Sequence, residues 1–291
     1  MIRTRHRRLI AATKLERTGC TKVPAIVGWL VLAWAASICA CAAHGAEIKI
    51  AGQAAVLMET RGGKILWQRN QNLSLAPAST TKILTALVVV ERSKASDIVA
   101  IPAEAARATG GTVHLQTGER LSVEQLLYGM MLGSANDAAI ALATHAGGTV
   151  EKFVGLMNDK ARSLGALRSN FRNSTGLPHK GHVTTARDLA MITRAALANV
   201  EFRKIVAAKN LPWKSAKWQG ELKNSNMLLK TYRGAIGVKT GQTSEAGFCL
   251  VAAAVRGEES FIAVILKSTE KSGWQDAKRL LDHGFKNFTA K

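Results

Sequence analysis

A serine and a lysine three residues apart are the first side chains in the sequence that could do chemistry together. Ser79 and Lys82 enclose the pattern Ser-x-x-Lys, and the residues from Ile83 to Val90 are almost wholly apolar. Such a run predicts a buried helix that Ser79, Thr80 and Thr81 cap at its start, and whose first turn places the serine and the lysine on one face. Burial lowers the pKa of a lysine, and a neutral lysine can take the proton that serine must lose to become a nucleophile. We therefore predict that Ser79 is a nucleophile and that Lys82 is its base.

A second pattern, Ser-x-Asn, is formed by Ser134 and Asn136 at a break between two helical runs. A hydroxyl and an amide at such a break can relay a proton and hold a substrate amide. Serine and asparagine also favour plain turns, so this pattern is uninformative when it stands alone.

A third pattern, Lys-Thr-Gly, occupies residues 239–241 of a strand-like run. The ammonium group of Lys239 and the hydroxyl of Thr240 can together bind a carboxylate. Gly241 has no side chain, so a substrate backbone can approach it closely. The backbone N–H of the next residue, Gln242, could join that of Ser79 in an oxyanion hole, where each donor typically contributes about 10²–10³ in rate.

The order of the three patterns carries more information than any one of them. A chance Ser-x-x-Lys is expected about once in a chain of this length. The sequence holds a second copy, from Ser268 to Lys271, with no Ser-x-Asn or Lys-Thr-Gly after it. Ser-x-x-Lys, Ser-x-Asn and Lys-Thr-Gly in this order are the motifs of β-lactamases and penicillin-binding proteins.

The chain from about Gln53 to Phe288 resembles the low-molecular-mass D-alanyl-D-alanine carboxypeptidases, which are penicillin-binding proteins. Four stretches carry this resemblance: Pro77–Lys82, Asn173–Leu177, Thr184–Leu189 and Gly237–Thr243. The resemblance implies a β-lactamase/DD-peptidase-like fold and an enzyme without a cofactor. It also implies residue roles: Ser79 forms the acyl-enzyme, Lys82 is the general base, Ser134 relays a proton, and Asn136, Lys239 and Thr240 bind the substrate.

The same resemblance implies the reaction and its partners. A peptidoglycan stem peptide would acylate Ser79, the terminal D-alanine would leave, and water would hydrolyse the acyl-enzyme. β-Lactams would acylate the same serine as covalent inhibitors, because their ring mimics the D-alanyl-D-alanine end. Longer members of the family continue into a C-terminal β domain. Only about fifty residues follow Gly241, so we expect that domain to be absent.

Three alternatives stay open for the activity. The family often has a basic residue near Trp274 that helps to hold the terminal carboxylate; Lys271 could replace it, or the enzyme could be a DD-endopeptidase that acts on cross-linked stems. A class A-like β-lactamase would need a deacylating glutamate, and no Glu-x-x-Leu-Asn lies between Ser134 and Lys239. A non-catalytic β-lactam sensor is the third alternative, and the complete set of motifs argues against it.

The predicted elements place these motifs in an α+β fold. Hydrophobic patterns predict a β-hairpin and three later strands: Ala54–Thr60, Lys64–Gln68, Ile236–Thr240, Phe248–Val255 and Phe261–Lys267. They also predict helices: residues 122–146 with a break at Gly133–Ser134, Val150–Leu164, Thr185–Asn199 and Trp274–Phe285. We therefore expect one antiparallel sheet built from both chain ends and flanked by helices, with a helical lobe inserted at roughly residues 100–215.

The N-terminal segment predicts export. Residues 1–22 are basic and polar, residues 23–43 are uncharged and mostly apolar, and small residues follow at positions 45 and 46. This is the pattern of a secretory signal, and its apolar part is also about long enough for an uncleaved anchor. We therefore expect residues 1–46 to be a signal peptide or signal anchor. Residues 47–291 should form a single catalytic domain in the periplasm or on the outer face of the cytoplasmic membrane.

The net charge of +20 narrows the range of partners that the protein could bind. A strongly basic surface attracts polyanions. Export argues against nucleic acid, which leaves an anionic envelope surface as a partner, or a charge that merely keeps the protein soluble. Cys249 lies in an apolar run, so we expect a buried core thiol. No metal is expected because the histidines after residue 46 form no His-Glu-x-x-His pattern, and His179 and His182 should face solvent or substrate.

Overall fold

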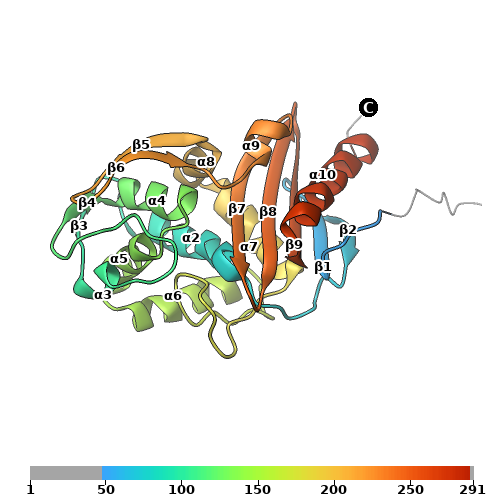
Figure 1. Cartoon of the computed structure of the whole chain (residues 1–291). Helices are drawn as coiled ribbons and strands as arrows, with labels where there is room; N and C mark the ends of the chain where they lie inside the picture. The colour runs from blue at the N-terminus through green and yellow to red at the C-terminus, as the bar shows by residue number, and fades with distance from the viewer. Residues whose placement is uncertain (1–47, 289–291) are drawn as a thin grey trace, which may run out of the picture. The chain divides into compact units, whose positions relative to one another are not determined.

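The computed structural model of the chain describes residues 48–288 (Figure 1). The segment 1–46, in which the sequence predicts an export signal, lies outside the described residues. Within the described range, none of the helices combines the length and the apolar character that crossing a membrane requires.

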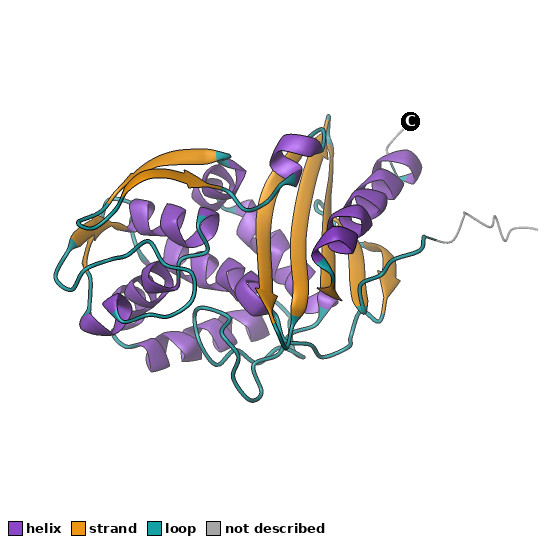
Figure 2. Cartoon of the chain, viewed as in Figure 1, coloured by secondary structure: helices purple, strands orange, loops and turns teal. Residues whose placement is uncertain are grey.

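The two ends of the described chain meet in one antiparallel sheet of five strands, in the order β2-β1-β9-β8-β7. Its strands are β1 (Ala54–Glu59), β2 (Ile65–Arg69), β7 (Ala235–Thr243), β8 (Gly247–Arg256) and β9 (Glu259–Ser268). Strand β1 pairs with β9, with Ala54 opposite Leu266 and Glu59 opposite Phe261. The predicted sheet is thereby confirmed, and β7 is one of its edge strands (Figure 2).

Helices cover both faces of this sheet (Figures 1 and 2). The covering helices are α10 (Glu270–Asn287) on one face, and α7 (Ala186–Ala198) and α8 (Val200–Ala207) on the other. Successive side chains of a strand point to opposite faces, so Val56 and Met58 of β1 join the core on the α7 side, while Ala55 and Leu57 join the core under α10. Burial on both faces explains why the inner strands are apolar without alternation.

Helix α2 runs through the middle of a group of helices beside the sheet (Figure 2). The group consists of α2 (Lys82–Arg92), α3 (Ala103–Ala106), α4 (Val123–Leu132), α5 (Asn136–Gly147) and α6 (Val150–Ser163). Every residue of α2 from Lys82 to Val89 is buried, as expected for a helix that is apolar on all sides. The predicted break at Gly133–Ser134 is confirmed, since it separates α4 from α5.

Several short elements were not predicted. They are the antiparallel pair of β3 (Ile98–Ala100) and β4 (Arg120–Ser122), the hairpin of β5 (Asn210–Lys214) and β6 (Gln219–Lys223), and the helices α3, α8 and α9 (Leu228–Thr231). In β5 and β6 only Trp213 and Leu222 are buried, so these strands have no apolar alternation to detect.

The segment that carries Ser79 differs from its predicted form. Residues Ala78–Thr81 form a 3₁₀ turn, η1, and α2 begins only at Lys82, without a side-chain cap. The threonine hydroxyls are engaged elsewhere: Thr80 Oγ1 donates to a backbone carbonyl at 2.6 Å, and Thr81 Oγ1 lies 2.9 Å from a histidine ring. The prediction that these residues cap the helix is therefore wrong, while the burial of the helix is confirmed.

Candidate active site

The Nζ atom of Lys82 has three polar neighbours and no access to solvent. It lies 3.1 Å from Ser79 Oγ, 2.7 Å from Asn136 Oδ1 and 2.6 Å from the carbonyl oxygen of Thr175. The Lys82 side chain is 0% exposed. The structure therefore brings together the residues predicted to be the nucleophile and the base with one that was predicted to bind substrate.

Burial favours the neutral form of the Lys82 amine. Desolvation lowers the pKa of its amino group well below the usual lysine value, the nearby Lys239 lowers it further, and the Asp137 carboxylate opposes the shift. A neutral amine keeps two N–H donors and one lone pair. When the two N–H groups are donated to the amide and carbonyl oxygens, the lone pair faces the Ser79 hydroxyl, which is the arrangement that a general base requires.

The loop that provides the Thr175 carbonyl is fixed by its own side chains and by α2. Asn173 Oδ1 accepts hydrogen bonds from the backbone N–H groups of Thr175 and Gly176. The hydroxyl of Thr85 on α2 donates to the carbonyl of Ser174 at 2.8 Å. The role of Thr175 was not predicted, because a backbone acceptor leaves no signature in residue type.

His182 ties the same loop to η1. Its Nδ1 accepts a hydrogen bond from the backbone N–H of Arg172 at 3.1 Å. The neutral ring therefore carries its proton on Nε2, which lies 2.9 Å from Thr81 Oγ1. The side chain is 4% exposed, and burial, aided by nearby His179, lowers its pKa to about 4. The expectation that His182 faces solvent or substrate is wrong; His179 is exposed as expected.

The turn between α4 and α5 places Ser134 at the same cavity as Ser79, and Asn136, the first residue of α5, lines that cavity as well. Ser134 has a φ of 57°, a left-handed conformation that costs a serine on the order of 1 kcal/mol. Asn136 Nδ2 donates to the carbonyl of Thr109 at 2.7 Å, which orients Oδ1 toward Lys82. Within the described part of the chain, the Ser134 hydroxyl makes no hydrogen bond to Ser79 or Lys82, so its role as a relay stays a prediction.

A buried carboxylate beside Asn136 holds the neighbouring loop. Asp137 is 1% exposed and accepts hydrogen bonds from the backbone N–H groups of Val113 and Leu115, at 3.0 and 3.1 Å. The chain just before Val113 includes Gly110, which lines the cavity. Asp137 was not predicted as part of the site, because an acidic residue in the first turn of a helix is typical of any helix N-terminus.

Strand β7 brings Gly241 against the backbone of Ser79. A Cβ atom at Gly241 would lie 2.6 Å from the backbone nitrogen of Ser79 and 2.9 Å from that of Thr80, so a larger residue would push the strand away. Because β7 continues to Thr243, Gln242 belongs to the strand and lines the cavity. The backbone of β7 thus passes directly beside the nucleophile.

Lys239 and Thr240 are neighbours on β7 but have different surroundings. The Lys239 side chain is 1% exposed, its Nζ donates to the Thr240 carbonyl at 3.0 Å, and burial lowers its pKa to about 7. Near neutral pH Lys239 is therefore only partly protonated. Thr240 lines the cavity together with Ser225, whose Oγ lies 2.6 Å from Thr240 Oγ1 and which no sequence pattern indicated.

These residues surround one cavity of about 390 Å³. It is lined by Ser79, Gly110, Gly111, Ser134, Asn136, Gly176, Leu177, Ser225, Thr240, Gly241, Gln242, Thr243, Phe248, Glu270 and Trp274. Lys82 and Lys239 are buried beneath this lining. Trp274 reaches the cavity, whereas Lys271, the predicted replacement for a basic residue there, is exposed and is not among the lining residues.

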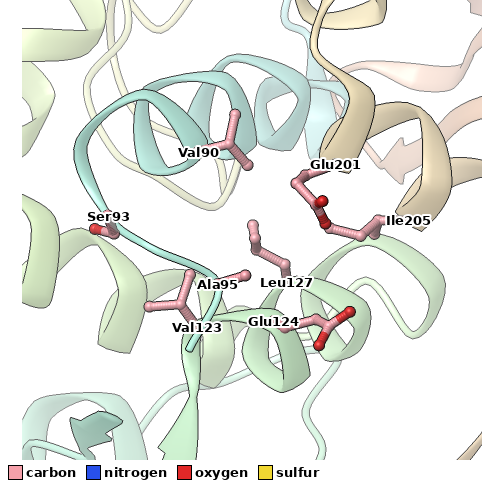
Figure 3. Close-up of a pocket in the computed structure, with 8 residues that line it drawn as sticks. All are labelled: Val90, Ser93, Ala95, Val123, Glu124, Leu127, Glu201 and Ile205. Carbon is pink, nitrogen blue, oxygen red and sulfur yellow. The ribbon is translucent and has the colours of Figure 1, made fainter. Parts of the chain in front are cut away.

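A second, smaller hollow lies between α2, α4 and α8 (Figure 3). The apolar side chains of Val90, Leu127 and Ile205 border it, together with Glu124 and Glu201. Its volume of about 30 Å³ is roughly that of one water molecule in the liquid, so it cannot hold a substrate.

The geometry around Ser79 fits transfer of an acyl group through a serine ester. The hydroxyl has beside it a buried amine of lowered pKa, and the backbone of β7 lies next to the N–H of Ser79, where an oxyanion could be held. Cys249 does not compete as a nucleophile, because it is fully buried and burial raises the pKa of its thiol to about 11. It is a core thiol, as predicted.

Comparison with known sequences identifies relatives of this chain. A family model described as D-alanyl-D-alanine carboxypeptidase matches residues 40–270. The D-alanyl-D-alanine carboxypeptidase DacF of Bacillus subtilis is 36% identical over 249 residues, which are 83% of this chain and 64% of that protein. The D-alanyl-D-alanine carboxypeptidase of Streptomyces sp. strain K15 is 34% identical over 255 residues, which are 81% of this chain and 88% of that protein. The chain thus spans slightly less than two thirds of the Bacillus relative.

Solved structures share the fold. The Streptomyces K15 DD-transpeptidase has a TM-score of 0.78 and 35% identity, with 82% of this chain and 98% of that chain covered. An evolved putative penicillin-binding protein homologue from Mycobacterium tuberculosis has a TM-score of 0.80 and 34% identity, with 86% of this chain and 97% of that chain covered. The predicted DD-peptidase-like fold is thereby confirmed.

Proposed function

Since the chain belongs to the D-alanyl-D-alanine carboxypeptidase family, we propose that it removes the terminal D-alanine of peptidoglycan stem peptides through an acyl-enzyme on Ser79. The observation that carries this proposal is the distance of 3.1 Å between Ser79 Oγ and the buried Nζ of Lys82. β-Lactams are covalent inhibitors in this proposal, and no cofactor takes part.

In the acylation step, Lys82 takes the proton of the Ser79 hydroxyl, and Oγ attacks the carbonyl carbon between the two D-alanines. The N–H groups of Ser79 and Gln242 stabilise the negative charge that develops on the carbonyl oxygen. The close approach of Gly241 to Ser79 N supports this hole. The tetrahedral species collapses to a serine ester, and the amine of the terminal D-alanine leaves with a proton that Ser134 relays from Lys82.

In the deacylation step, water enters the space that the amine has left. Neutral Lys82 accepts a proton from the water, which attacks the ester carbonyl, and Ser79 regains its proton as the shortened stem leaves. A β-lactam acylates Ser79 in the same way. Its leaving amine stays tethered to the acyl group by the ring system, so water is hindered and the ester persists.

Substrate is held from both walls of the cavity. The Asn136 amide donates one N–H to Thr109, and its second N–H is free in this proposal to bind a substrate carbonyl. Thr240 and Ser225 share one hydrogen bond, so one of their two hydroxyls can donate to a substrate carboxylate, with Lys239 in its protonated form behind them.

A second candidate is a DD-endopeptidase that cuts cross-linked stems. The observation that favours it is the end of the cavity at which Glu270 and Trp274 lie and from which Lys271 is absent. A free terminal carboxylate gains nothing from a glutamate and an indole. In a cross-link the scissile amide leads into a second stem, so no terminal alanine carboxylate has to be held there.

The test offers the full-length chain a pentapeptide stem and a cross-linked dimer, and identifies the products by mass spectrometry. Loss of one alanine from the pentapeptide supports the carboxypeptidase, and cleavage of the dimer alone supports the endopeptidase. Ser79→Ala should abolish both reactions and labelling by a fluorescent penicillin. Fast penicillin turnover would instead indicate a β-lactamase, and labelling without peptide cleavage would indicate a sensor.

We also propose that residues 47–291 act as one catalytic domain outside the cytoplasm, in the periplasm or on the outer face of the membrane. The charge pattern of residues 1–46 supports this location, and the net charge of +20 suits an anionic envelope surface. Cell fractionation of the full-length chain and of a chain without residues 1–46 tests it. Recovery of the full-length chain in the cytoplasm would contradict the proposal.

A further inference from the structure

One end of the catalytic cavity combines a carboxylate and an indole from the same helix. Glu270 and Trp274 are four residues apart on α10, so their side chains lie on one face of the helix, and both line the cavity that contains Ser79. An acidic group and an aromatic ring at this spacing can both contact the same group of a ligand.

The Glu270 carboxylate is the source of charge at this end. Among the described residues that line the cavity, Glu270 alone is formally charged, and it has no ion-pair partner in the described range. Its place in the first turn of α10 stabilises the helix, as does that of Glu151 in the first turn of α6. Glu270 differs from Glu151 in that it also borders the space in which the substrate is cut.

Trp274 presents hydrocarbon to the cavity and is held in place. Its Nε1 is buried, so the part of the side chain that is exposed consists of carbon atoms. The ring packs against Phe248, with the ring centroids 5.3 Å apart at an angle of 57°. A fixed indole beside a carboxylate is the chemistry that recognises an ammonium group, through a charge pair and a cation–π contact.

We propose that Glu270 and Trp274 form a subsite for a primary ammonium group of the substrate. The ligand class is a peptide that carries a free amine, such as a stem whose diamino acid side chain is not yet cross-linked. The inference deepens the proposed function and rests on it, because the subsite belongs to the cavity of Ser79. A carboxylate at the same place would meet the charge of Glu270 and bind less well.

The experiment compares synthetic acyl-D-alanyl-D-amino acid peptides that differ in one charge. One pair carries a lysine or a norleucine before the scissile bond, and the other carries D-lysine or D-norleucine after it. In one of the two pairs, we expect the full-length enzyme to cleave the peptide with the amine with a kcat/KM roughly three- to tenfold higher than that of the norleucine peptide. High salt should reduce this difference. Glu270→Gln should remove the preference and Trp274→Leu should reduce it. Glu151→Gln, which changes an exposed glutamate in the first turn of α6, should keep it.

The possible outcomes distinguish a failure of the proposed ammonium subsite from a failure of the proposed function. If the wild type cleaves the norleucine peptides but prefers the amine in neither pair, the ammonium subsite is wrong and the proposed function stands. A preference that survives in Glu270→Gln also overturns the subsite. If the wild type cleaves none of the peptides, the proposed function fails and the subsite falls with it.

Discussion

Ser79 Oγ and Lys82 Nζ lie 3.1 Å apart although Ser79 belongs to η1 and Lys82 is the first residue of α2. In a 3₁₀ turn, residues i and i+3 lie directly above one another, so the tight turn brings the two side chains closer than an α-helical turn would. Ala78, with a φ of 48°, starts this turn in a left-handed conformation. The strain at Ala78 thus accompanies the contact on which the proposed reaction depends.

Removal of the base should stop acylation while leaving the fold intact. Lys82→Met keeps a long apolar side chain in the buried site, so the packing of α2 should persist. We expect the rate at which benzylpenicillin acylates Ser79 to fall by about 10³-fold, within the range that general bases contribute. The adduct is measured by mass spectrometry over time, with Ser79→Ala as the variant that forms none. Acylation of Lys82→Met at the wild-type rate would exclude Lys82 as the base.

The pH dependence of kcat/KM should reflect the titration of the two buried lysines, whose effects on activity are opposite. Lys82 acts without its proton, so acylation rises with pH, and its lowered pKa brings this rise below the range of an ordinary lysine. Lys239 binds carboxylate with its proton, and its pKa is about 7, so binding weakens as the pH rises above that value. We expect a bell-shaped profile of kcat/KM. Lys239→Arg should move the falling limb to higher pH, and an unmoved limb would count against this role of Lys239.

The close contact of β7 with the nucleophile should make Gly241 intolerant of a side chain. In Gly241→Ala, the new Cβ would lie 2.6 Å from Ser79 N, so the strand must move away from the oxyanion hole. We expect kcat/KM to fall by about 10²-fold or more, as when one oxyanion donor is lost. Gly155→Ala on α6 is the control, because its Cβ would have no neighbour within 4 Å. Wild-type activity in Gly241→Ala would contradict the proposed oxyanion hole between β7 and Ser79.

His182 should make the protein less stable in mild acid. Its pKa is about 4 in the folded chain and 6.5 when unperturbed, so between these values the unfolded state binds more protons. The free energy of unfolding should therefore decrease as pH falls from 6.5 to 4, by on the order of 2–3 kcal/mol in total, and should not depend on His182 above that window. Urea unfolding across this range measures the slope. His182→Gln should flatten it, and an equal slope in both proteins would refute the assignment.

The small hollow between α2, α4 and α8 should accept one more methyl group (Figure 3). Val90→Ile adds that group at the border of the hollow and keeps a β-branched side chain in the helix. We expect the free energy of unfolding to rise by about 0.5–1 kcal/mol, the contribution of one buried methylene, with unchanged activity. Val90→Ala should lower it by a similar amount or more. Thermal unfolding of both variants gives the comparison, and destabilisation by isoleucine would mean that the hollow cannot take the group.

Much of the fold followed from local patterns. The hairpin of β1 and β2, the strands β7 to β9 and the helices α4 to α7 were predicted because each has a hydrophobic period that its own residues determine. Their assembly into one sheet from both ends followed from the position of strands at the two ends of the chain. The hairpin of β5 and β6 was missed because its side chains are mostly exposed.

The sequence by itself determined which residue types are available for chemistry, and their ordered motifs predicted acyl transfer to a serine. The tertiary structure alone decided how that chemistry is held. The Thr175 carbonyl reaches Lys82 across 93 residues. His182 ties its loop to Thr81 across 101 residues, and Glu270 arrives at the cavity from the last helix. These contacts depend on backbone atoms and on the packing of segments that are distant in the sequence. Neither is reflected in the residue types or the spacing from which a sequence pattern is recognised, so the sequence could not predict them.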